Sequence, residues 1–533
     1  MSRKLVLTTI FIAVLIGMLG LSFNVQRVMA GGTIYIRADG SVDPSTVPIQ
    51  RNGNTYIFIG NINDAVVVER DNIIIDGAGY TIQGAGSWAG IGLAGRSNVT
   101  IRNTIIKGFR YGINLDDSSH NSIFGNNITA NQKDGISLES SSYNSIFSNS
   151  IIENDEDGTS LTSFSNHNNI YGNHLIENDF DGIVVGSSSY NKVYGNNITE
   201  NDEDGIDLYE SSYNSIFGNN ITENWFDGIE IGYSSDHNNI YGNNIADNDE
   251  DGIDLYQSSN NSIFENIIIA NWRHGIELYS STNNSIFGNR VTGNYPGIYL
   301  VTSLNNTITR NNITRNYPGI HFRESSNNTL YHNNFVNNSR QVYDESWDHP
   351  EILSSVNFWD DGYPYGGNYW SDYTGLDSDY DGIGNSKHVL DLENTDNYPL
   401  MGMFSCFNAS LGYSIDVISN STIEDFEYFN ETIKMYVSNI TSDQRSSFCR
   451  LCIPHALMNV ENLLPIVDDN FGEWAEFNNN VYDNGTHRWV YFTFEYPANK
   501  IEILPEFPSL LILPLFMIAT LLAVIVYRRK YTT

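Results

Sequence analysis

The chain has 533 residues, enough for several domains, and its 63 acidic and 27 basic side chains give a formal net charge of -36. This balance argues against a nucleic-acid partner, because such binding rests on clustered lysine and arginine. The 44 glycines and 33 tyrosines favour turns and pleated surfaces over helices. We therefore expect an all-β protein that binds cations or stays soluble in a salty exterior.

The first 30 residues are typical of a secretory signal peptide. Arg3 and Lys4 form a basic start, residues 5–21 are mostly apolar, and residues 28–30 resemble a small-residue cleavage site. Cleavage after Ala30 would leave the mature chain outside the cytoplasm. The alternative is an uncleaved anchor helix.

Residues 31–89 contain strand signals, such as 55–59 and 65–68, but no regular repeat. They are expected to form an N-terminal cap and the first coils of the repeat domain, with the stack starting at 72–77. A cap is needed because an open sheet end exposes unpaired backbone groups.

Residues 90–340 carry a tandem repeat of about 23 residues, each marked by a glycine. Three short apolar alternations per repeat predict three short strands, and the lack of a helical half-repeat argues against a leucine-rich repeat. Such a unit buries its apolar face only by stacking on its neighbours, which predicts a right-handed parallel β-helix of about 11 coils. The repeat glycines are Gly90, Gly112, Gly135, Gly158, Gly182, Gly205, Gly228, Gly252, Gly275, Gly297 and Gly319.

Within one coil, alternation points Ile206, Leu208, Ile216 and Ile221 inward. Asparagines recur at two turns of each repeat, as in the series that begin at Asn121 and Asn126. Their side-chain amides are expected to hydrogen-bond from coil to coil, so these residues are structural.

Acidic residues form two outward columns along the predicted coils. The functional interpretation is a calcium-binding edge or a carboxylate site acting on sugars, with Asp204, Asp227 and Glu230 as weak catalytic candidates. The alternative is Asp-Gly turn chemistry on a solvated acidic face. The first column is Asp134, Asp157, Asp181, Asp204, Asp227 and Asp251, and the second is Asp207, Glu230, Asp254 and Glu277.

Aromatic side chains accompany this edge, which is typical of polysaccharide-binding surfaces. Arg273 and His274 are the only basic pair in the acidic zone, and in a lyase or epimerase they could neutralise a uronate and supply a base. The glycan-binding candidates are Trp225, Trp272, Tyr295 and Tyr317, which share one repeat position, together with Asp207, Asp254 and Glu277.

Residues 341–400 are expected to close the helix. Asp377, Asp379 and Asp381 stand at alternate positions before a glycine, as in the front half of a calcium loop. The twelfth position is His388 instead of glutamate, so this is not an EF-hand, and Asp391 or Glu393 would have to complete the shell. The alternative is a plain polar turn.

The repeats, with the segments 367–373 (Gly-Asn-Tyr-Trp-Ser-Asp-Tyr) and 379–384 (Asp-Tyr-Asp-Gly-Ile-Gly), resemble the NosD-like family over about residues 31–400. The resemblance implies a periplasmic or surface β-helix protein, often labelled copper-binding, that overlaps the class of carbohydrate-binding and sugar-hydrolase β-helices. The family label also implies a role in maturing a copper enzyme. The repeats, however, contain no Met-rich or Cys-His copper cluster.

Residues 401–504 lose the repeat, and their alternating runs predict a small β-sandwich. Cys449 and Cys452 form a C-x-x-C, with Cys406 upstream. We expect one disulfide to Cys406 and one free thiol. The alternative is a zinc site completed by His455 or His487.

Residues 505–533 are expected to attach the protein to a membrane. The apolar run Leu510–Tyr527 can just span a membrane, and the basic residues after it are expected to stay cytoplasmic. Pro505-Glu506-Phe507 resembles the C-terminal sorting signal of archaeal surface proteins, which implies processing by an archaeosortase. The alternative is a plain transmembrane anchor, and either one tethers the protein to the outer face of the membrane.

Three functions follow from these patterns. The first is a cell-surface protein whose acidic and aromatic face binds extracellular glycans or surface-layer components, with calcium. The second is a lyase, epimerase or hydrolase acting on uronate-rich polysaccharide. The third is an accessory protein for copper-enzyme maturation, as the family resemblance implies. The missing copper ligands weigh against the third, and non-enzymatic glycan binding is preferred over catalysis.

Overall fold

The computed structural model divides into two compact units, which adjoin in the sequence at Asn261 and Ser262. The predicted signal peptide and nearly all of the predicted C-terminal anchor lie outside the described residues. Within the described part of the chain, no helix is long and apolar enough to cross a membrane. The structure describes residues 32–86, 88–410, 412–440, 444, 446–458, 463–467, 477–495, 500–505 and 522.

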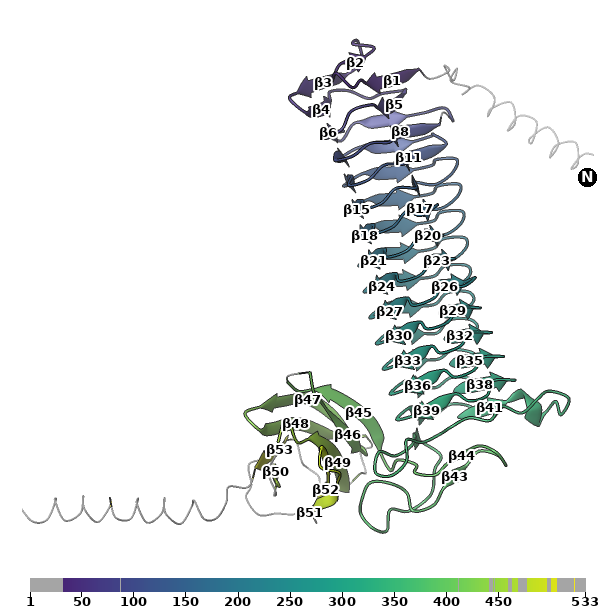
Figure 1. The fold of residues 1–533 in the computed structure, drawn as a ribbon, viewed down its shortest axis with the longest axis vertical. Helices are drawn as coiled ribbons and strands as arrows, with labels where there is room; N and C mark the ends of the chain where they lie inside the picture. Colours follow the sequence, from purple (N-terminus) through teal and green to yellow (C-terminus); the bar gives the residue numbers. More distant parts are fainter. Residues whose placement is uncertain are drawn as a thin grey trace, which may run out of the picture. The chain divides into compact units, whose positions relative to one another are not determined.

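Each repeat folds into three short strands, and within each unit a strand pairs in parallel with its equivalent one repeat later (Figure 1). The pairing is in register: Ile206 faces Ile229, Ile216 faces Ile240, and Ile221 faces Ile245. The predicted inward residues are confirmed, since Ile206, Leu208, Ile216 and Ile221 are all 0% exposed. The repeat region is therefore a parallel β-solenoid with an aliphatic core.

From β8 to β38, the first strand of each turn starts beside the repeat glycine. Within each unit, neighbours in the following order are hydrogen-bonded in parallel. In the first unit the strands are β1 (Thr33–Ile36), β5 (Ala65–Val68), β8 (Ala89–Ala94), β11 (Tyr111–Asp116), β14 (Ile136–Glu139), β17 (Thr159–Thr162), β20 (Ile183–Gly186), β23 (Ile206–Tyr209), β26 (Ile229–Gly232) and β29 (Ile253–Tyr256); in the second they are β32 (Ile276–Tyr279), β35 (Ile298–Val301), β38 (Ile320–Arg323) and β41 (Val342–Asp344).

The second strand of each turn follows the serine- and asparagine-rich turn of the repeat. In the first unit these strands are β4 (Thr55–Phe58), β6 (Ile73–Asp76), β9 (Val99–Arg102), β12 (Ser122–Phe124), β15 (Ser145–Phe147), β18 (Asn169–Tyr171), β21 (Lys192–Tyr194), β24 (Ser215–Phe217) and β27 (Asn239–Tyr241); in the second they are β30 (Ser262–Phe264), β33 (Ser285–Phe287), β36 (Thr307–Thr309) and β39 (Thr329–Tyr331).

The third strand of each turn completes the triangle of sheets. In the first unit these strands are β7 (Thr81–Gln83), β10 (Ile105–Lys107), β13 (Asn127–Thr129), β16 (Ser150–Ile152), β19 (His174–Ile176), β22 (Asn197–Thr199), β25 (Asn220–Thr222) and β28 (Asn244–Ala246); in the second they are β31 (Ile267–Ile269), β34 (Arg290–Thr292), β37 (Asn312–Thr314), β40 (Asn334–Val336) and β42 (Tyr369–Trp370).

The solenoid has about 13 turns, more than the 11 coils predicted from the glycine repeat. The prediction was low because the first turns lack the glycine signature, although β1 already pairs in parallel with β5. Two short antiparallel strands flank this start: β2 (Val42–Asp43) pairs with β1, and β3 (Ile49–Asn52) pairs with β4. The stack thus begins well before residue 72, where the sequence placed it.

The asparagine ladders hydrogen-bond from coil to coil, as predicted. Asn144 donates its side-chain amide to Asn168 Oδ1 at 3.1 Å, and Asn149 donates to Asn173 Oδ1 at 3.0 Å. The structure also contains a third ladder, which was not predicted. In this ladder the side-chain amide of Asn154 donates to Asn178 Oδ1 at 2.9 Å. These amides satisfy buried turn groups, which would otherwise destabilise the fold.

The closing segment continues the ladders and caps the core. Asn333 donates to Asn368 Oδ1 at 3.0 Å, and the Trp370 ring stacks on Phe335 with centroids 4.4 Å apart. The indole N–H of Trp370 donates to Asp396 Oδ2 at 2.8 Å. The 367–373 segment therefore covers the last coil with a buried ring. The other short elements of the closing segment, residues 341–400, are η1 (Glu345–Trp347), β43 (His388–Val389) and β44 (Thr395–Asp396).

Two antiparallel sheets follow the solenoid, and side chains from both share one hydrophobic core that includes Val417, Met435, Phe492 and Ile503. One sheet has the order β45 (Met403–Asn408), β46 (Ser414–Ser419), β49 (Ser446–Pro454), β52 (His487–Glu495), β51 (Phe477–Asp483). The other has the order β47 (Ser421–Phe429), β48 (Thr432–Asn439), β53 (Lys500–Pro505), β50 (Leu463–Val467).

The predicted disulfide to Cys406 is wrong, because all three cysteines are free. Cys406 on β45 and Cys452 on β49 both face Asp416 on the intervening β46. Two strand spacings of about 4.8 Å separate their Cα atoms by about 10 Å, beyond the reach of a disulfide. Cys449 is fully buried, and burial raises the pKa of its thiol to about 12.

Candidate functional site

The first acidic column is a buried hydrogen-bonded ladder. The backbone N–H of Asp227 donates to Asp204 Oδ1 at 2.7 Å, and that of Asp251 donates to Asp227 Oδ1 at 2.7 Å. Asp204 and Asp227 are only 8% and 9% exposed. Each carboxyl thus holds the turn of the next coil, as the asparagines do elsewhere, and this favours a structural role over a catalytic one.

Burial raises the pKa of these carboxyls, and for Asp157 and Asp204 neighbouring carboxyls of the column raise it further. The pKa of Asp134 rises to about 6 and that of Asp157 to about 8, in both cases mainly through burial. Burial and the carboxyl of Asp227 hold the pKa of Asp204 well above its usual range. The ladder therefore carries protons at a pH where ordinary aspartates are ionised.

The second acidic column is more open to solvent. Asp207, Glu230 and Asp254 are half-buried on β23, β26 and β29, and Asp207 lies opposite Glu230. Burial, followed by the charge of Glu230, raises the pKa of Asp207 to about 7. This column is acidic only over its last three strands in the first unit, because the paired position on the preceding strands is Ser160 and then Val184.

Both columns change chemistry in the second unit. The position before the repeat glycine, aspartate in six earlier repeats, becomes His274 and then proline. The other column continues from Glu277 through Tyr299, His321 and Tyr343, which pair directly on β32, β35, β38 and β41. At these two repeat positions, acidic side chains thus give way to imidazole, proline and phenol.

A pocket of about 610 Å³ opens over this part of the solenoid, and all the residues that line it belong to the second unit. It brings together Arg273 and His274, the predicted basic pair, with Tyr295 and Tyr317, two of the predicted glycan-binding rings. The lining residues are Arg273, His274, Tyr295, Pro296, Tyr299, Tyr317, Pro318, His321, Ser339, Arg340, Tyr343 and Asp348.

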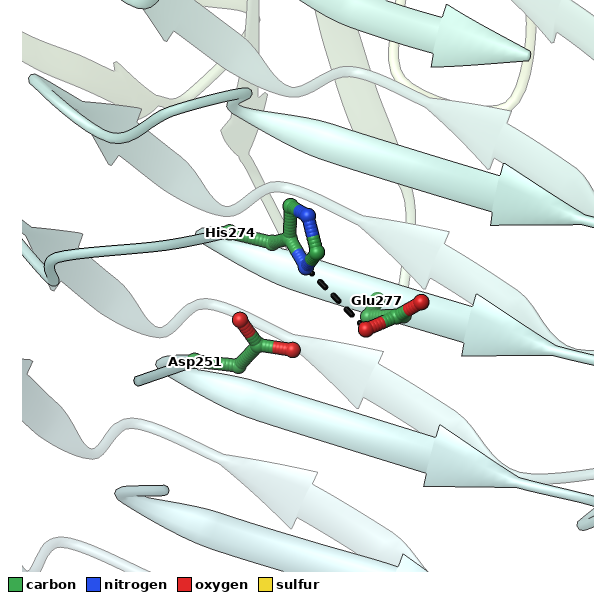
Figure 2. A group of neighbouring side chains, drawn as sticks. All are labelled: Asp251, His274 and Glu277. Atoms are coloured by element: carbon green, nitrogen blue, oxygen red, sulfur yellow. Dashed lines mark ion pairs between the residues drawn. The ribbon is translucent and has the colours of Figure 1, made fainter. Parts of the chain in front are cut away.

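His274 is held in place at the edge of the pocket. Its Nδ1 lies 3.1 Å from a carboxylate oxygen of Glu277 on β32, the ion pair drawn in Figure 2. Its ring lies 4.8 Å from the ring of Tyr299. Figure 2 also labels Asp251, which has the position of His274 in the preceding repeat of the sequence. A carboxylate that orients an imidazole is an arrangement that supports proton transfer.

The floor of the pocket is a stack of rings. The ring of His321 lies 4.4 Å from Tyr299 and 4.7 Å from Tyr343, measured between centroids. Burial, followed by the nearby His274, lowers the pKa of His321 to about 4, so its ring is neutral at neutral pH. The phenol of Tyr343 donates to Asp348 Oδ2 at 3.1 Å.

One wall of the pocket is an exposed pair of tyrosines. Tyr295 and Tyr317 stack with centroids 4.9 Å apart and remain 59% and 56% exposed. Trp225 and Trp272 share their repeat position and are also exposed, but neither lines the pocket. The structure thus brings two of the four predicted glycan-binding rings into the pocket.

The predicted calcium residues are partly brought together. Asp377, Asp379 and Asp381 each place a carboxylate oxygen within 4.8 Å of the others. Oxygen donors of this kind suit a calcium ion. Asp391 is engaged elsewhere, accepting from the indole of Trp347 at 3.1 Å and from the backbone of Asn394 at 2.7 Å.

The sequence interpretation missed Tyr299, His321, Arg340 and Tyr343. The first two could have been found by continuing the column of Glu277 for two further repeats, because the spacing of 22 residues is unbroken. Tyr343 and Arg340 lie after the last repeat glycine. They join the pocket only because β41 adds one more strand beside β38.

Comparisons with known proteins agree with this architecture. Residues 228–375 match the family described as periplasmic copper-binding protein (NosD), and residues 32–198 and 89–245 match the right handed beta helix region. Together with the parallel solenoid, these matches support a right-handed β-helix family. No curated protein sequence matches the chain.

Solved structures similar to this β-helix protein include carbohydrate enzymes and phage tailspikes. The A-module of Azotobacter vinelandii mannuronan C-5 epimerase AlgE4 is 17% identical, with TM-score 0.44, covering 52% of this chain and 88% of that one. The periplasmic alginate epimerase AlgG is 16% identical, with TM-score 0.39, covering 59% and 82%. The Siphovirus 9NA tailspike receptor binding domain is 9% identical, with TM-score 0.39, covering 83% and 92%.

Proposed function

We propose that this β-helix protein binds glycans at the pocket of the second unit. The observation that carries the proposal is the joining of exposed stacked rings, Tyr295 and Tyr317, to the polar groups of Arg273, His274 and Arg340 in one open pocket. Rings offer a flat apolar surface to the C–H face of a sugar, and a few polar groups around them fix its orientation.

The setting we propose for this activity is the outer surface of the cell. The signal peptide and the C-terminal anchor expected from the sequence would present the solenoid outside the membrane, where extracellular glycans or surface-layer components are available. The aspartates 377, 379 and 381 would hold calcium and stiffen the segment that closes the solenoid. Binding would then serve attachment or adhesion.

A glycan array probed with the full chain, with and without calcium, tests this proposal. The double variant Tyr295→Ala/Tyr317→Ala is expected to bind any glycan hit about tenfold more weakly. Tyr190→Ala/Tyr213→Ala is the matched control, because these rings also stack, at 5.1 Å, and are 51% and 49% exposed outside the pocket. Absence of glycan binding in both conditions would overturn the proposal.

Catalysis on uronate-rich polysaccharide is the second candidate, and one observation favours it. The His274–Glu277 pair lies at the pocket edge with the ring of Tyr299 beside it, so a base and a hydroxyl face the same space. The test is turnover of polyuronates, followed by reducing ends and by unsaturated products. His274→Ala must abolish any turnover found, and turnover that survives this change would exclude the assigned base.

A further inference from the structure

We infer that the glycan bound in this pocket is anionic, and that Arg340, assisted by Arg273, holds its charged group. The inference rests on the proposed glycan binding and names the class of ligand. The shared chemistry is a sugar with an acidic substituent, either a carboxylate or a sulfate. A guanidinium binds both groups through paired N–H donors.

The first support is the state of Arg340. Its guanidinium lies over the ring of Tyr343, 5.4 Å from the centroid, and the residue is exposed at the pocket. Among the described residues it forms no ion pair, whereas Arg323 pairs with Glu345 at 3.5 Å. A ring-stacked guanidinium keeps its edge N–H groups available for an incoming oxyanion.

The second support is the balance of charge around the pocket. Its charged lining residues are two arginines, Arg273 and Arg340, and a single acidic residue, Asp348, while His321 is neutral. Asp348 is already engaged, because it accepts from the phenol of Tyr343. In a chain with a net charge of -36, this lining is a local reversal of sign. A recess with one sign of charge concentrates ligands of the opposite sign.

The third support is that tyrosine and histidine replace the carboxylates of the second column in the turns that form the pocket. The column that holds Asp207, Glu230 and Asp254 in the first unit holds tyrosine and histidine at residues 299, 321 and 343. An anionic ligand over the acidic stretch would meet like charges at every coil, which opposes binding. The neutral floor of the pocket imposes no such repulsion.

The geometry also indicates how the sugar would lie. Tyr295 and Tyr317 present exposed rings on one wall, and Arg340 and Tyr343 lie on another part of the same lining. A pyranose stacked on the tyrosines would direct a substituent at its ring edge toward the guanidinium. Neutral sugars could use the tyrosines alone, so the arginine is the residue that selects for charge.

The experiment compares three sets of oligosaccharides of equal length, titrated calorimetrically into the full chain at low salt. The first set is polyuronate, the second is sulfated, and the third is neutral. The expected result is tight binding of an acidic set, at least about tenfold weaker binding of the neutral set, and loss of affinity as salt rises. The stronger of the two acidic sets identifies the charged group.

Three variants locate the charge recognition. Arg340→Gln should reduce affinity for the acidic set about tenfold and leave any neutral binding unchanged. Arg340→Lys should restore part of the loss, since it returns the charge without the paired donors. Arg315→Gln is the matched control, because Arg315 is an exposed arginine outside the pocket lining.

The outcomes separate the two proposals. Neutral glycans that bind as tightly as acidic ones would overturn the inference while leaving glycan binding intact. Equal loss for acidic and neutral sets in Arg340→Gln would likewise overturn it, because the residue would then act on the fold of the pocket instead of on charge. Absence of binding by all three sets would overturn both.

Discussion

The acidic stretch of repeats in the first unit and the pocket in the second use one backbone design for different chemistry. Both have the same three strands, asparagine ladders and aliphatic core. They differ at two positions per turn, where carboxyls such as Asp227 and Glu230 give way to His274 and Tyr299. In a solenoid, a change at one repeat position produces a new surface without disturbing the fold.

The comparison also separates structural from functional polar groups. Asp204 and Asp227 of the first column accept backbone N–H groups and are almost fully buried. In the pocket, Arg273 and Arg340 are exposed and His321 is half-buried around an open volume, while His274 is buried at its edge. A titratable side chain in an outward column is therefore not evidence of catalysis until its hydrogen bonds are known.

The largest effect is expected from breaking the backbone design that both regions share. A Cβ at Gly205 would lie 2.6 Å from the carbonyl of Gly228 and 2.4 Å from Ile221 Cγ2. Gly205→Ala should therefore destabilise the solenoid by about 3 kcal/mol, as overpacking does. The measurement is the urea midpoint followed by circular dichroism.

Gly195→Ala is the control for this prediction. A Cβ at Gly195 has nothing within 4 Å, and only the positive φ of 63° disfavours alanine. The expected destabilisation is about 1 kcal/mol. Equal midpoints for the two variants would show that coil spacing does not limit the size of the turn residue.

The next largest effect is expected from the buried aspartates of the first acidic column. The pKa of Asp157 is raised from 3.8 in the unfolded chain to about 8 in the fold, and that of Asp134 to about 6. A raised pKa means that the folded state binds protons more tightly than the unfolded chain does. The stabilisation of the fold by this proton binding is complete below pH 4. It is lost as pH rises toward 8.

Asp157→Asn removes the ionisation and keeps the acceptor oxygen, so it should stabilise the protein by about 2 kcal/mol at pH 8 and little at pH 4. Thermal unfolding at both pH values measures this. Asp236→Asn, in a partly exposed turn, serves as the control. A gain of the same size at both pH values would mean that the ladder is not protonated in the fold.

The third prediction concerns a substitution that gives the pocket the charge of the acidic stretch. Tyr299→Glu restores the residue type that this column has at Glu230 and Glu277. The new carboxylate faces the pocket and should weaken binding of an acidic glycan about tenfold through like-charge repulsion. Calorimetric titration measures the loss.

Raising the salt concentration should recover part of this affinity, because screening weakens the repulsion. Tyr299→Leu is the companion variant that removes the phenol without adding charge. If it loses as much affinity as Tyr299→Glu, packing and not charge controls the column.

The smallest effect concerns the closing segment. Calcium should raise the thermal midpoint by a few degrees, about 1 kcal/mol, and Asp379→Asn should remove the increase. Asp391→Asn is the control, since Asp391 bonds Trp347 and Asn394 instead of the other aspartates. A calcium response that survives Asp379→Asn and disappears in Asp391→Asn would place the ion elsewhere.

The repeat pattern is enough to predict the solenoid, because a repeat of about 23 residues with alternating aliphatic positions buries its apolar face by stacking on its neighbours. Ile206 and Ile216 point inward, and the asparagine amides bond between coils, as periodicity predicts. The extra turns were missed because β1 and β5 have strand character without the glycine signature.

The repeat pattern does not predict which of the outward residues share a pocket. Sequence position assigns Trp225 and Tyr295 to the same column, yet only Tyr295 lines the pocket, because the other lining residues, such as His321 and Tyr343, belong to later turns of the second unit. The tertiary structure likewise showed that β46 separates Cys406 from Cys452. Periodicity fixes the face of a residue, whereas cavities, burial and partners depend on neighbours that lie apart in sequence.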